Sequence, residues 1–458
     1  MLERIGLFLL LIVPAGCTHF GHYPVNEPVK KYEPGYGYVF QNMGSPDNSE
    51  ELLLILSFSG GGTRAAAFSY GILEELKATE VTLEGGKRSL LSEVDLISGV
   101  SGGSFTPAYY GLFGVRIFED FESRFLKKNI QGALSARVFL NPINWFRLSS
   151  PFFDRSDLAT EYYNQHVFDG KNFGDFLKKK GPMILINATD MSRGTRLSFS
   201  QAFFDVICSD LSKFPVARAC AASSAAPGVL SPITIKNYAG GCGYVLPPQF
   251  EKSSLTYRQR EMIENLMPLL DSEKKPHLHL IDRGVADNLG LRAIEEAVSA
   301  VGNFWMTLKV AGMGKAHKVA FIVVNAEKKI DDQWDRIEFV PPFAATLSNY
   351  SSIAIARYNR ETVALLLESL EGWTREIREG RCLPGQISTE PGSCDDITFY
   401  LAEVRFEDLD DPEERSYLNN LPTSFQLKPK EVDKLRDAAR RLLRKSKDFQ
   451  RLLRDLEK

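Results

Sequence analysis

One serine of this chain stands in a pattern that can make a hydroxyl nucleophilic. Residues 99–103 read Gly-Val-Ser-Gly-Gly, so Ser101 occupies the centre of a G-x-S-x-G sequence. Flanking glycines let the backbone bend sharply and push the serine outward at the start of a helix, where free N–H groups favour developing negative charge. The pattern therefore predicts an exposed, reactive serine; a small-residue turn without chemistry is the alternative.

A second candidate is the glycine run at residues 60–62, which is followed by Arg64. Glycines allow close backbone approach and leave N–H donors unobstructed at a helix N-terminus, so this loop suits an anion or an oxyanion. The G-x-G-x-x-A spacing also fits a dinucleotide fingerprint, with Glu80 or Glu84 placed for a ribose. We favour the oxyanion hole, because it explains both glycine-rich motifs with one site that includes Ser101.

The third candidate is Asp282, which ends an apolar stretch and precedes Arg283 and Gly284. A strand is expected to deliver Asp282 at its carboxyl end, and in open α/β sheets that edge is where ligands bind. Asp282 is therefore expected to lie in a site rather than in the core.

The elements that must position these residues are apolar runs alternating with helical patterns. Near-continuous apolar runs are typical of strands covered on both faces, and they are found at residues 52–58, 94–97, 182–188 and 319–325. Helical stretches are expected at 65–76, after residue 104 and at 291–301. The small residues at 221–228, including Ser223 and Ser224, are interpreted as a close-packing segment.

Composition limits the classes of function. The chain has 458 residues, of which 44% are hydrophobic, and this predicts one large domain with appendages. With 55 basic and 58 acidic residues the net charge is −3, so bulk charge does not favour a nucleic-acid partner.

The N-terminus predicts export. Residues 7–13 are apolar but too few to span a bilayer, and they have the proportions of a signal-peptide core. Small residues before Cys17 resemble a bacterial lipobox, although Pro14 and Glu3 depart from it. We expect a signal peptide over residues 1–16, lipidation at Cys17 and a membrane anchor, with an outer-membrane location favoured by Thr18. A secretory signal or an uncleaved anchor with an incidental cysteine is the alternative.

Residues 17–50 lack periodicity and are rich in Pro, Gly and Tyr, so we expect a tether that lies over the surface or spaces the domain from the membrane. Export would place the other cysteines in an oxidising compartment. Cys208 with Cys220, and Cys382 with Cys394, are close enough in sequence to pair, which would leave Cys242 over.

Two other segments allow two interpretations each. Residues 139–153 are dense in aromatics, and a cap packed on the core is favoured over an exposed membrane-contacting patch. Residues 428–456 repeat apolar residues at helical spacing opposite a basic face. A helix packed on the domain is favoured there over an interfacial helix touching anionic lipid.

Taken together, the three motifs resemble the patatin-like acyl hydrolases over roughly residues 52–325. The resemblance implies an α/β fold: a three-layer α/β/α domain with a mostly parallel sheet over residues 51–330. From the helical patterns beyond it we expect a mainly helical C-terminal region at 331–458. The resemblance also implies a phospholipase A or lysophospholipase activity on lipid esters, without a cofactor or metal. Ser101 would be the nucleophile and Asp282 the general base, and the amides of Gly60, Gly61 and Gly62 would stabilise the oxyanion.

One departure from the family pattern concerns Arg283, which replaces the middle glycine of Asp-Gly-Gly. Its charge would favour ionised Asp282 and weaken it as a base, or would reach a substrate phosphate. A required positive φ would strain an arginine there. Arg64 is expected to pair structurally with a carboxylate, with contact to a lipid head group as the alternative.

Two competing functions remain open at this point. A Ser–His–Asp esterase would use His277, His279 or His317 as its base, although none lies in a glycine-rich turn. An inactive hydrolase fold used for lipid-anchored binding is the non-enzymatic alternative, and Arg283 is the feature that supports it. Head group, acyl position and oligomeric state are not encoded in these patterns.

Overall fold

A computed structural model of the chain describes residues 26–45, 48–83, 86–251, 255–328, 333–382 and 397–457. The predicted signal peptide, Cys17 and Cys394 lie outside the described residues. No helix in the described ranges is both long enough and apolar enough to cross a membrane.

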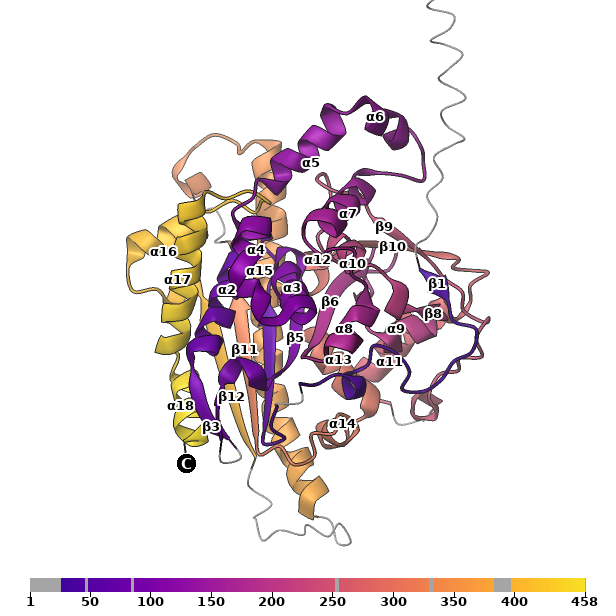
Figure 1. The fold of residues 1–458 in the computed structure, drawn as a ribbon, viewed down its shortest axis with the longest axis vertical. Coiled ribbons are helices and arrows are strands. Elements are labelled where there is room, and N and C mark those ends of the chain that lie inside the picture. Colours follow the sequence, from indigo (N-terminus) through magenta and orange to yellow (C-terminus); the bar gives the residue numbers. More distant parts are fainter. Residues whose placement is uncertain are drawn as a thin grey trace, which may run out of the picture.

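A central sheet organises the described part of the chain (Figure 1). Its strand order is β12-β11-β2-β5-β6-β10-β9, and the short β7 pairs with β6. The strands are β2 Leu52–Phe58, β5 Val94–Val100, β6 Met183–Asp190, β7 Arg196–Ser198, β9 Ile233–Lys236, β10 His277–Asp282, β11 Lys318–Asn325 and β12 Thr398–Arg405. Strands β12, β11, β2, β5 and β6 are parallel, whereas β10 runs antiparallel to β6 and β9 antiparallel to β10.

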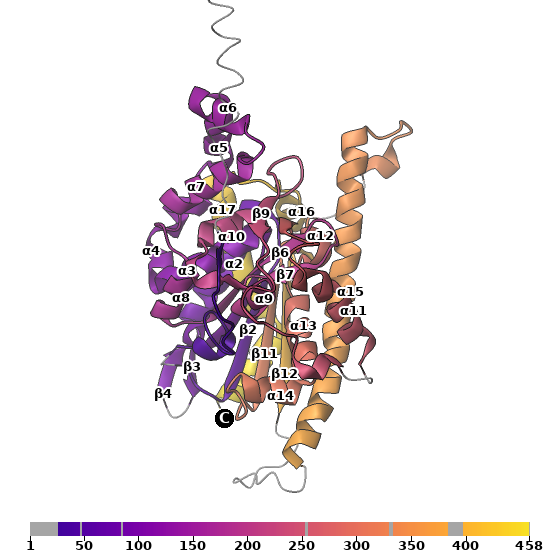
Figure 2. The ribbon, with the colours of Figure 1, turned by 90° about the vertical axis from the view of Figure 1, so that its right-hand side faces the viewer.

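Helices cover both faces of this sheet (Figure 2). One face carries α2 Gly62–Ala78, α3 Phe105–Phe113, α8 Phe173–Lys179, α10 Val216–Ser223 and α17 Pro429–Lys445. The other carries α13 Arg292–Val301, α14 Phe304–Val310 and α15 Phe343–Cys382. In β2, Leu54 and Leu56 join one apolar cluster while Leu53 and Ile55 join the other, so both faces of the strand are buried. The predicted three-layer α/β/α fold with a mostly parallel sheet is confirmed.

The remaining elements are short or peripheral. They are β1 Glu27–Pro28, β3 Glu80–Leu83, β4 Gly86–Ser89, α4 Ile117–Phe121, α5 Ile130–Phe139, α6 Pro142–Leu148, α7 Arg155–His166, β8 Ser209–Asp210, α9 Gln201–Val206, α11 Tyr257–Leu266, α12 Gly284–Asp287, α16 Pro412–Asn419 and α18 Lys447–Leu456.

The described part of the predicted tether lies on the domain. Strand β1 pairs with β8, and Tyr38 is fully buried. The Tyr38 hydroxyl donates to the Ile184 carbonyl at 3.1 Å and accepts from the Ile184 amide at 2.8 Å. Because a buried hydroxyl needs such partners, this segment is part of the folded unit from residue 26 onwards.

The C-terminal region is mainly helical, but it also supplies β12, the edge strand of the central sheet. Helix α17 buries Val432, Leu435 and Leu442 against the domain. Its basic face pairs with carboxylates of the domain, since Arg436 contacts Glu74 at 2.6 Å. The prediction of a helix packed on the domain is therefore confirmed.

Two predictions from the sequence are wrong. Cys208 is bonded to Cys242 and not to Cys220, which is a buried free thiol in α10. Sequence proximity misled here, because the fold brings the segments at 208 and 242 together while α10 turns Cys220 into the core. The aromatic segment 139–153 is not a packed cap either: Trp145 is 55% exposed, as part of two helices that project from the domain.

Candidate active site

The serine turn is sharp and strained. Strand β5 ends at Val100, and Ser101 opens a short 3-10 turn that leads into α3. Ser101 has a φ of 52°, in the left-handed region that non-glycine residues seldom adopt. The turn is pressed onto the glycine loop, because a Cβ on Gly102 would lie 2.2 Å from the Gly62 carbonyl oxygen. This is the strand–turn–helix geometry that a G-x-S-x-G elbow requires.

Asp282 lies directly against the serine. The Ser101 Oγ donates to Asp282 Oδ2 at 2.6 Å, and the other carboxylate oxygen accepts from the Gly284 amide at 2.8 Å. Asp282 does end a strand, as predicted, but β10 is antiparallel to β6 and pairs Asp282 with Ala188. The carboxylate therefore reaches the serine from the opposite direction to the parallel strands. The structure thus brings together two side chains that are 181 positions apart.

The buried environment of Asp282 favours the neutral, protonated carboxyl more than water does. Burial raises the pKa of the Asp282 carboxyl to about 6, and the hydrogen bonds from Ser101 and Gly284 only partly oppose this. A carboxylate with a pKa near the working pH is ionised in the resting state and still basic enough to accept a proton.

The glycine loop faces the serine, but one of its three amides is engaged. The Gly60 amide donates to the Asn288 carbonyl at 3.1 Å, which differs from the predicted set of three oxyanion donors. Within the described residues, no carbonyl accepts from the Gly61 or Gly62 amide. Both glycines have positive φ, 143° and 62°, and α2 begins at Gly62. Two N–H groups at a helix start therefore remain as candidate donors.

The dinucleotide interpretation of this loop is not supported by the fold. Glu80 follows the end of α2, a helix of 17 residues that starts at the loop. At about 1.5 Å per residue, this puts Glu80 about 25 Å from the glycines. Glu84 lies outside the described residues.

Ser223 is a positioning residue that the sequence interpretation missed. Its hydroxyl accepts from the Ser101 amide at 2.8 Å, and Ser223 is fully buried at the end of α10. The sequence pattern predicts only a packing role for it, as part of the small-residue segment. Nothing in that segment distinguishes the role of Ser223, because the contact joins residues 122 positions apart.

Arg283 is turned away from the site. Both Arg283 and Asp287 have fully buried side chains, and they pair at 3.0 Å. Arg283 also donates to the Leu197 carbonyl at 3.1 Å, and its φ of −73° is unstrained. The structure therefore contradicts the alternatives of a weakened base, a substrate contact and a strained backbone for Arg283.

Arg64 is structural too, but its partners are carbonyls rather than the predicted carboxylate. It is buried, and its Nε donates to the Ala326 carbonyl at 3.0 Å while Nη1 donates to the Leu421 carbonyl. These bonds tie the glycine loop to the end of β11 and to the C-terminal region. Burial lowers the pKa of Arg64 to about 10, and nearby Glu327 opposes the change.

The histidines do not complete a triad. The oxygen of Ser101 that a histidine would contact is bonded to Asp282. His277 and His279 point outward from β10 as exposed residues, with His279 against Thr234. His317 precedes β11, at the end of the sheet opposite the serine turn, where its amide contacts Glu51. In the described ranges, no group of three or more metal-ligating side chains is arranged to hold an ion.

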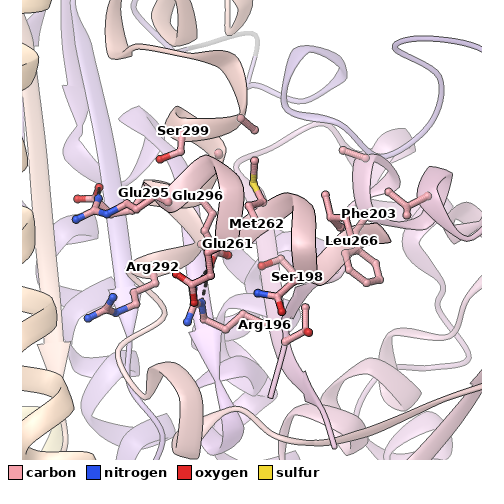
Figure 3. A pocket seen from close by; sticks show the side chains of 18 of the residues that line it. Arg196, Ser198, Phe203, Glu261, Met262, Leu266, Arg292, Glu295, Glu296 and Ser299 are labelled. Atoms are coloured by element: carbon pink, nitrogen blue, oxygen red, sulfur yellow. Dashed lines mark hydrogen bonds and ion pairs between the residues drawn. The ribbon is translucent and has the colours of Figure 1, made fainter. Parts of the chain in front are cut away.

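A separate cavity of about 690 Å³ opens between β7, α11 and α13 (Figure 3). Two ion pairs lie in its lining: Arg196 contacts Glu296, and Arg258 contacts Glu295 at 3.1 Å. Neither Ser101 nor Asp282 lines it. The chemistry of the candidate site is therefore not located in this cavity.

The chain was compared with protein families, curated proteins and solved structures. The family model of the Patatin-like phospholipases matches residues 56–292, which include Ser101 and Asp282. No curated protein sequence matches the chain significantly.

Two similar solved structures are both human GIVD cytosolic phospholipase A2. The first has 13% identity and a TM-score of 0.45, and covers 89% of this chain and 62% of that chain. The second, in complex with methyl gamma-linolenyl fluorophosphonate, has 13% identity and a TM-score of 0.42, and covers 89% and 59%. This chain thus matches less than two thirds of their length.

Proposed function

The chain belongs to the patatin-like phospholipase family, and on that premise we propose that it cleaves phospholipid or lysophospholipid carboxyl esters with a Ser101–Asp282 dyad. The observation that carries the proposal is the 2.6 Å contact between the Ser101 hydroxyl and the Asp282 carboxylate. Family membership supports lipid ester hydrolysis in general. The dyad and the phospholipase A or lysophospholipase subtype are our inference.

The proposed first step forms an acyl-enzyme. The Ser101 Oγ attacks the ester carbonyl carbon while its proton passes to Asp282 Oδ2. The oxygen of the tetrahedral intermediate accepts from the Gly61 and Gly62 amides, and a single donor of this kind is typically worth about 3 kcal/mol. When the intermediate collapses, the C–O bond breaks and the leaving alcohol takes the proton from Asp282.

The second step releases the fatty acid. A water molecule gives its proton to Asp282 and attacks the acyl carbon of the Ser101 ester. Collapse of this second intermediate returns the proton to the Ser101 oxygen and frees the carboxylic acid. Asp282 is thus first base and then acid in each half-reaction, which suits a pKa of about 6.

The test compares wild type with Ser101→Ala and Asp282→Asn on dispersed phospholipid and on a soluble short-chain nitrophenyl ester. We expect each variant to lose at least about a thousandfold in kcat on both substrates. Arg441→Met, a change in an exposed ion pair far along α17, serves as the matched control. Full activity in either variant would remove that residue from the dyad.

The alternatives receive less support. A binding protein on an inactive fold was favoured by Arg283, and that side chain is paired with Asp287 instead. A Ser–His–Asp esterase needs a histidine at the Ser101 oxygen, where Asp282 lies. Retained turnover after joint replacement of His277, His279 and His317 would dismiss it.

We also propose that Cys17 carries acyl chains that anchor the exported protein in a bacterial membrane, with the outer membrane favoured. The support is the lipobox-like sequence before Cys17. Mass spectrometry of the mature N-terminus tests it: an acylated Cys17 is expected, and an unmodified N-terminus would contradict the proposal.

A further inference from the structure

Exposed phenylalanine and tryptophan residues gather in two segments of the described part of the molecule. Every phenylalanine and tryptophan that is exposed among the described side chains lies in residues 139–152 or 339–343. These six residues, here called the aromatic rim, are Phe139, Trp145, Phe146, Phe152, Phe339 and Phe343. Their exposed fractions run from 49% for Phe146 to 83% for Phe339. Exposed apolar groups of this size mark interaction surfaces.

The two segments project from the same end of the molecule. Figures 1 and 2 both show α5 and α6 at the end where α15 also begins. The helices α5 and α6 bury only Ile130 and Asn144, so the core does not explain their aromatic residues. A packed cap would bury them.

Both segments are connected to the candidate active site. At the base of α5, the Phe425 carbonyl accepts from the Ile130 amide at 3.1 Å. The adjacent Ser424 carbonyl accepts from the Thr63 amide at 2.9 Å, next to the glycine loop. On the other side, Asn359 of α15 donates to Glu327, beside the Ala326 carbonyl that binds Arg64. The two helical segments that carry the rim therefore both contact residues next to the glycine loop.

The charge pattern indicates which surface the rim meets. No acidic residue occurs at 129–153, and no charged residue of either sign occurs at 339–356. Lys128 and Arg155 are exposed at the base of the α5–α6 projection. Asp154 and Glu338 border these two stretches, but within the stretches tryptophan and phenylalanine occur without carboxylates. Such a composition favours the head-group region of a bilayer.

From these observations we propose that the aromatic rim inserts into the surface of a phospholipid bilayer and places the Ser101 site against it. The proposal rests on the proposed function, because it states where the lipid ester is encountered. Contact with a bilayer lets a lipid ester enter the site without crossing water. Val285, three residues after Asp282, is a further exposed apolar residue close in sequence to the base.

The test uses the full chain with Cys17→Ser, so that no acyl chain at this position contributes, and any effect of residues 1–25 is the same in all variants. Trp145→Ser with Phe146→Ser removes two rim residues. Met306→Ser with Val310→Ser is the matched control: these residues are 42% and 46% exposed on α14, at the opposite end of the molecule (Figure 1). The probes are vesicles of phosphatidylcholine with and without phosphatidylglycerol, and a soluble short-chain nitrophenyl ester.

We expect the rim variant to bind vesicles more weakly by on the order of tenfold or more, and vesicle lipid hydrolysis to fall in parallel. Hydrolysis of the soluble ester is expected to stay at the wild-type rate, and the control is expected to match wild type throughout. Phe339→Ser with Phe343→Ser tests the second segment and replaces the first variant if that one fails to fold.

Wild-type vesicle binding by both rim variants, or an equal loss in the control, would overturn the proposal. The proposal would also be overturned if the wild-type protein did not bind vesicles but formed a dimer that the rim variant lacks. The rim would then be an interface between two copies of this chain. Ser101→Ala should bind vesicles normally. If wild type binds vesicles through the rim but does not hydrolyse the soluble ester, the proposed hydrolase function is contradicted, whereas the proposed contact of the rim with a bilayer is supported.

Discussion

The serine turn and the α5–α6 projection lie at the same end of the molecule and are built in opposite ways. At the turn, two stretches of backbone are in direct contact. A Cβ on Gly102 would lie 2.2 Å from the Gly62 carbonyl oxygen, and a Cβ on Gly103 would lie 2.2 Å from the Ser59 carbonyl oxygen. In the projection, Leu140 is 78% exposed and Phe139 69%. The turn is a place where almost any added atom is excluded. The projection is a place where large apolar groups add nothing to the core.

This contrast indicates that close packing around the serine turn and the exposed apolar surface of the projection serve different purposes. Close packing at the turn holds a strained Ser101 in place, as expected where strain serves chemistry. The projection leaves apolar area in water, which a monomer does not need for folding. Substitutions in the two regions are therefore expected to differ sharply in their effects.

The largest effect is expected from Gly102→Ala. The new methyl group would collide with the Gly62 backbone, so the turn and the glycine loop must separate. We expect activity to fall by at least about a thousandfold and the free energy of unfolding to drop by about 3 kcal/mol. Ester turnover and urea unfolding measure the two. Gly181→Ala is the control, since a Cβ there meets open space. Equal losses in the two variants would contradict the conclusion that close packing at the serine turn causes the effect.

A large loss of stability is also expected from Arg283→Met. Asp287 would be left buried without its ion-pair partner, and breaking a buried pair typically costs about 3 kcal/mol or more. Arg441→Met removes an exposed pair with Glu414 and is expected to cost less than about 1 kcal/mol. Thermal unfolding of both variants checks this. A stable Arg283→Met protein that has lost only phospholipid turnover would instead place Arg283 at the substrate.

The pH dependence follows from the raised pKa of Asp282, about 6. A protonated Asp282 cannot take the serine proton, so kcat/KM should fall about tenfold per pH unit below that value.

Stability should respond in the opposite sense. Because the folded protein holds this proton more tightly than the unfolded chain, it gains stability as pH falls from about 6 towards 3.8. Asp282→Asn should therefore be more stable than wild type at pH above 6, by on the order of 1 kcal/mol, with a gap that narrows in acid. A pH-independent gap would contradict the assignment.

A smaller effect is expected from Ser223→Ala. It removes the acceptor of the Ser101 amide and should loosen the turn without touching the substrate. We expect kcat to fall by about tenfold with KM nearly unchanged. Ser223→Thr, which keeps the hydroxyl, should recover part of the rate; a loss in KM alone would point to substrate contact instead.

The smallest effect is expected in the projection. Trp145→Ser with Phe146→Ser should change the free energy of unfolding by no more than about 0.5 kcal/mol, because both side chains are exposed. A loss as large as that of Gly102→Ala would show that the projection supports the core after all.

The sequence allowed much of the site to be predicted, because the relevant information is local. Apolar runs located the strands, and glycine spacing located the turn and the loop. The pairing of Ser101 with Asp282 is not local, and only the resemblance of the three ordered motifs to the patatin-like acyl hydrolases implied it.

Other features depend on contacts between distant residues, and local patterns do not encode them. Ser223 looks like any small packing residue until α10 is placed against β5. Arg283 looked like an active-site charge until the fold turned it towards Asp287. Cys242 forms a disulfide with Cys208, 34 positions earlier in the chain. The Gly60 amide donates to the Asn288 carbonyl, which is also distant in sequence. The exposure of residues 139–153 could not be predicted, because aromatic density is the same in a cap and in a projecting surface.

The most direct test of the Ser101–Asp282 dyad is labelling by a fluorophosphonate probe, followed by peptide mass spectrometry. We expect a single labelled site at Ser101 in wild type, much slower labelling of Asp282→Asn and none of Ser101→Ala. A folded wild-type protein that stays unlabelled at Ser101, or an Asp282→Asn variant labelled at the wild-type rate, would contradict the dyad.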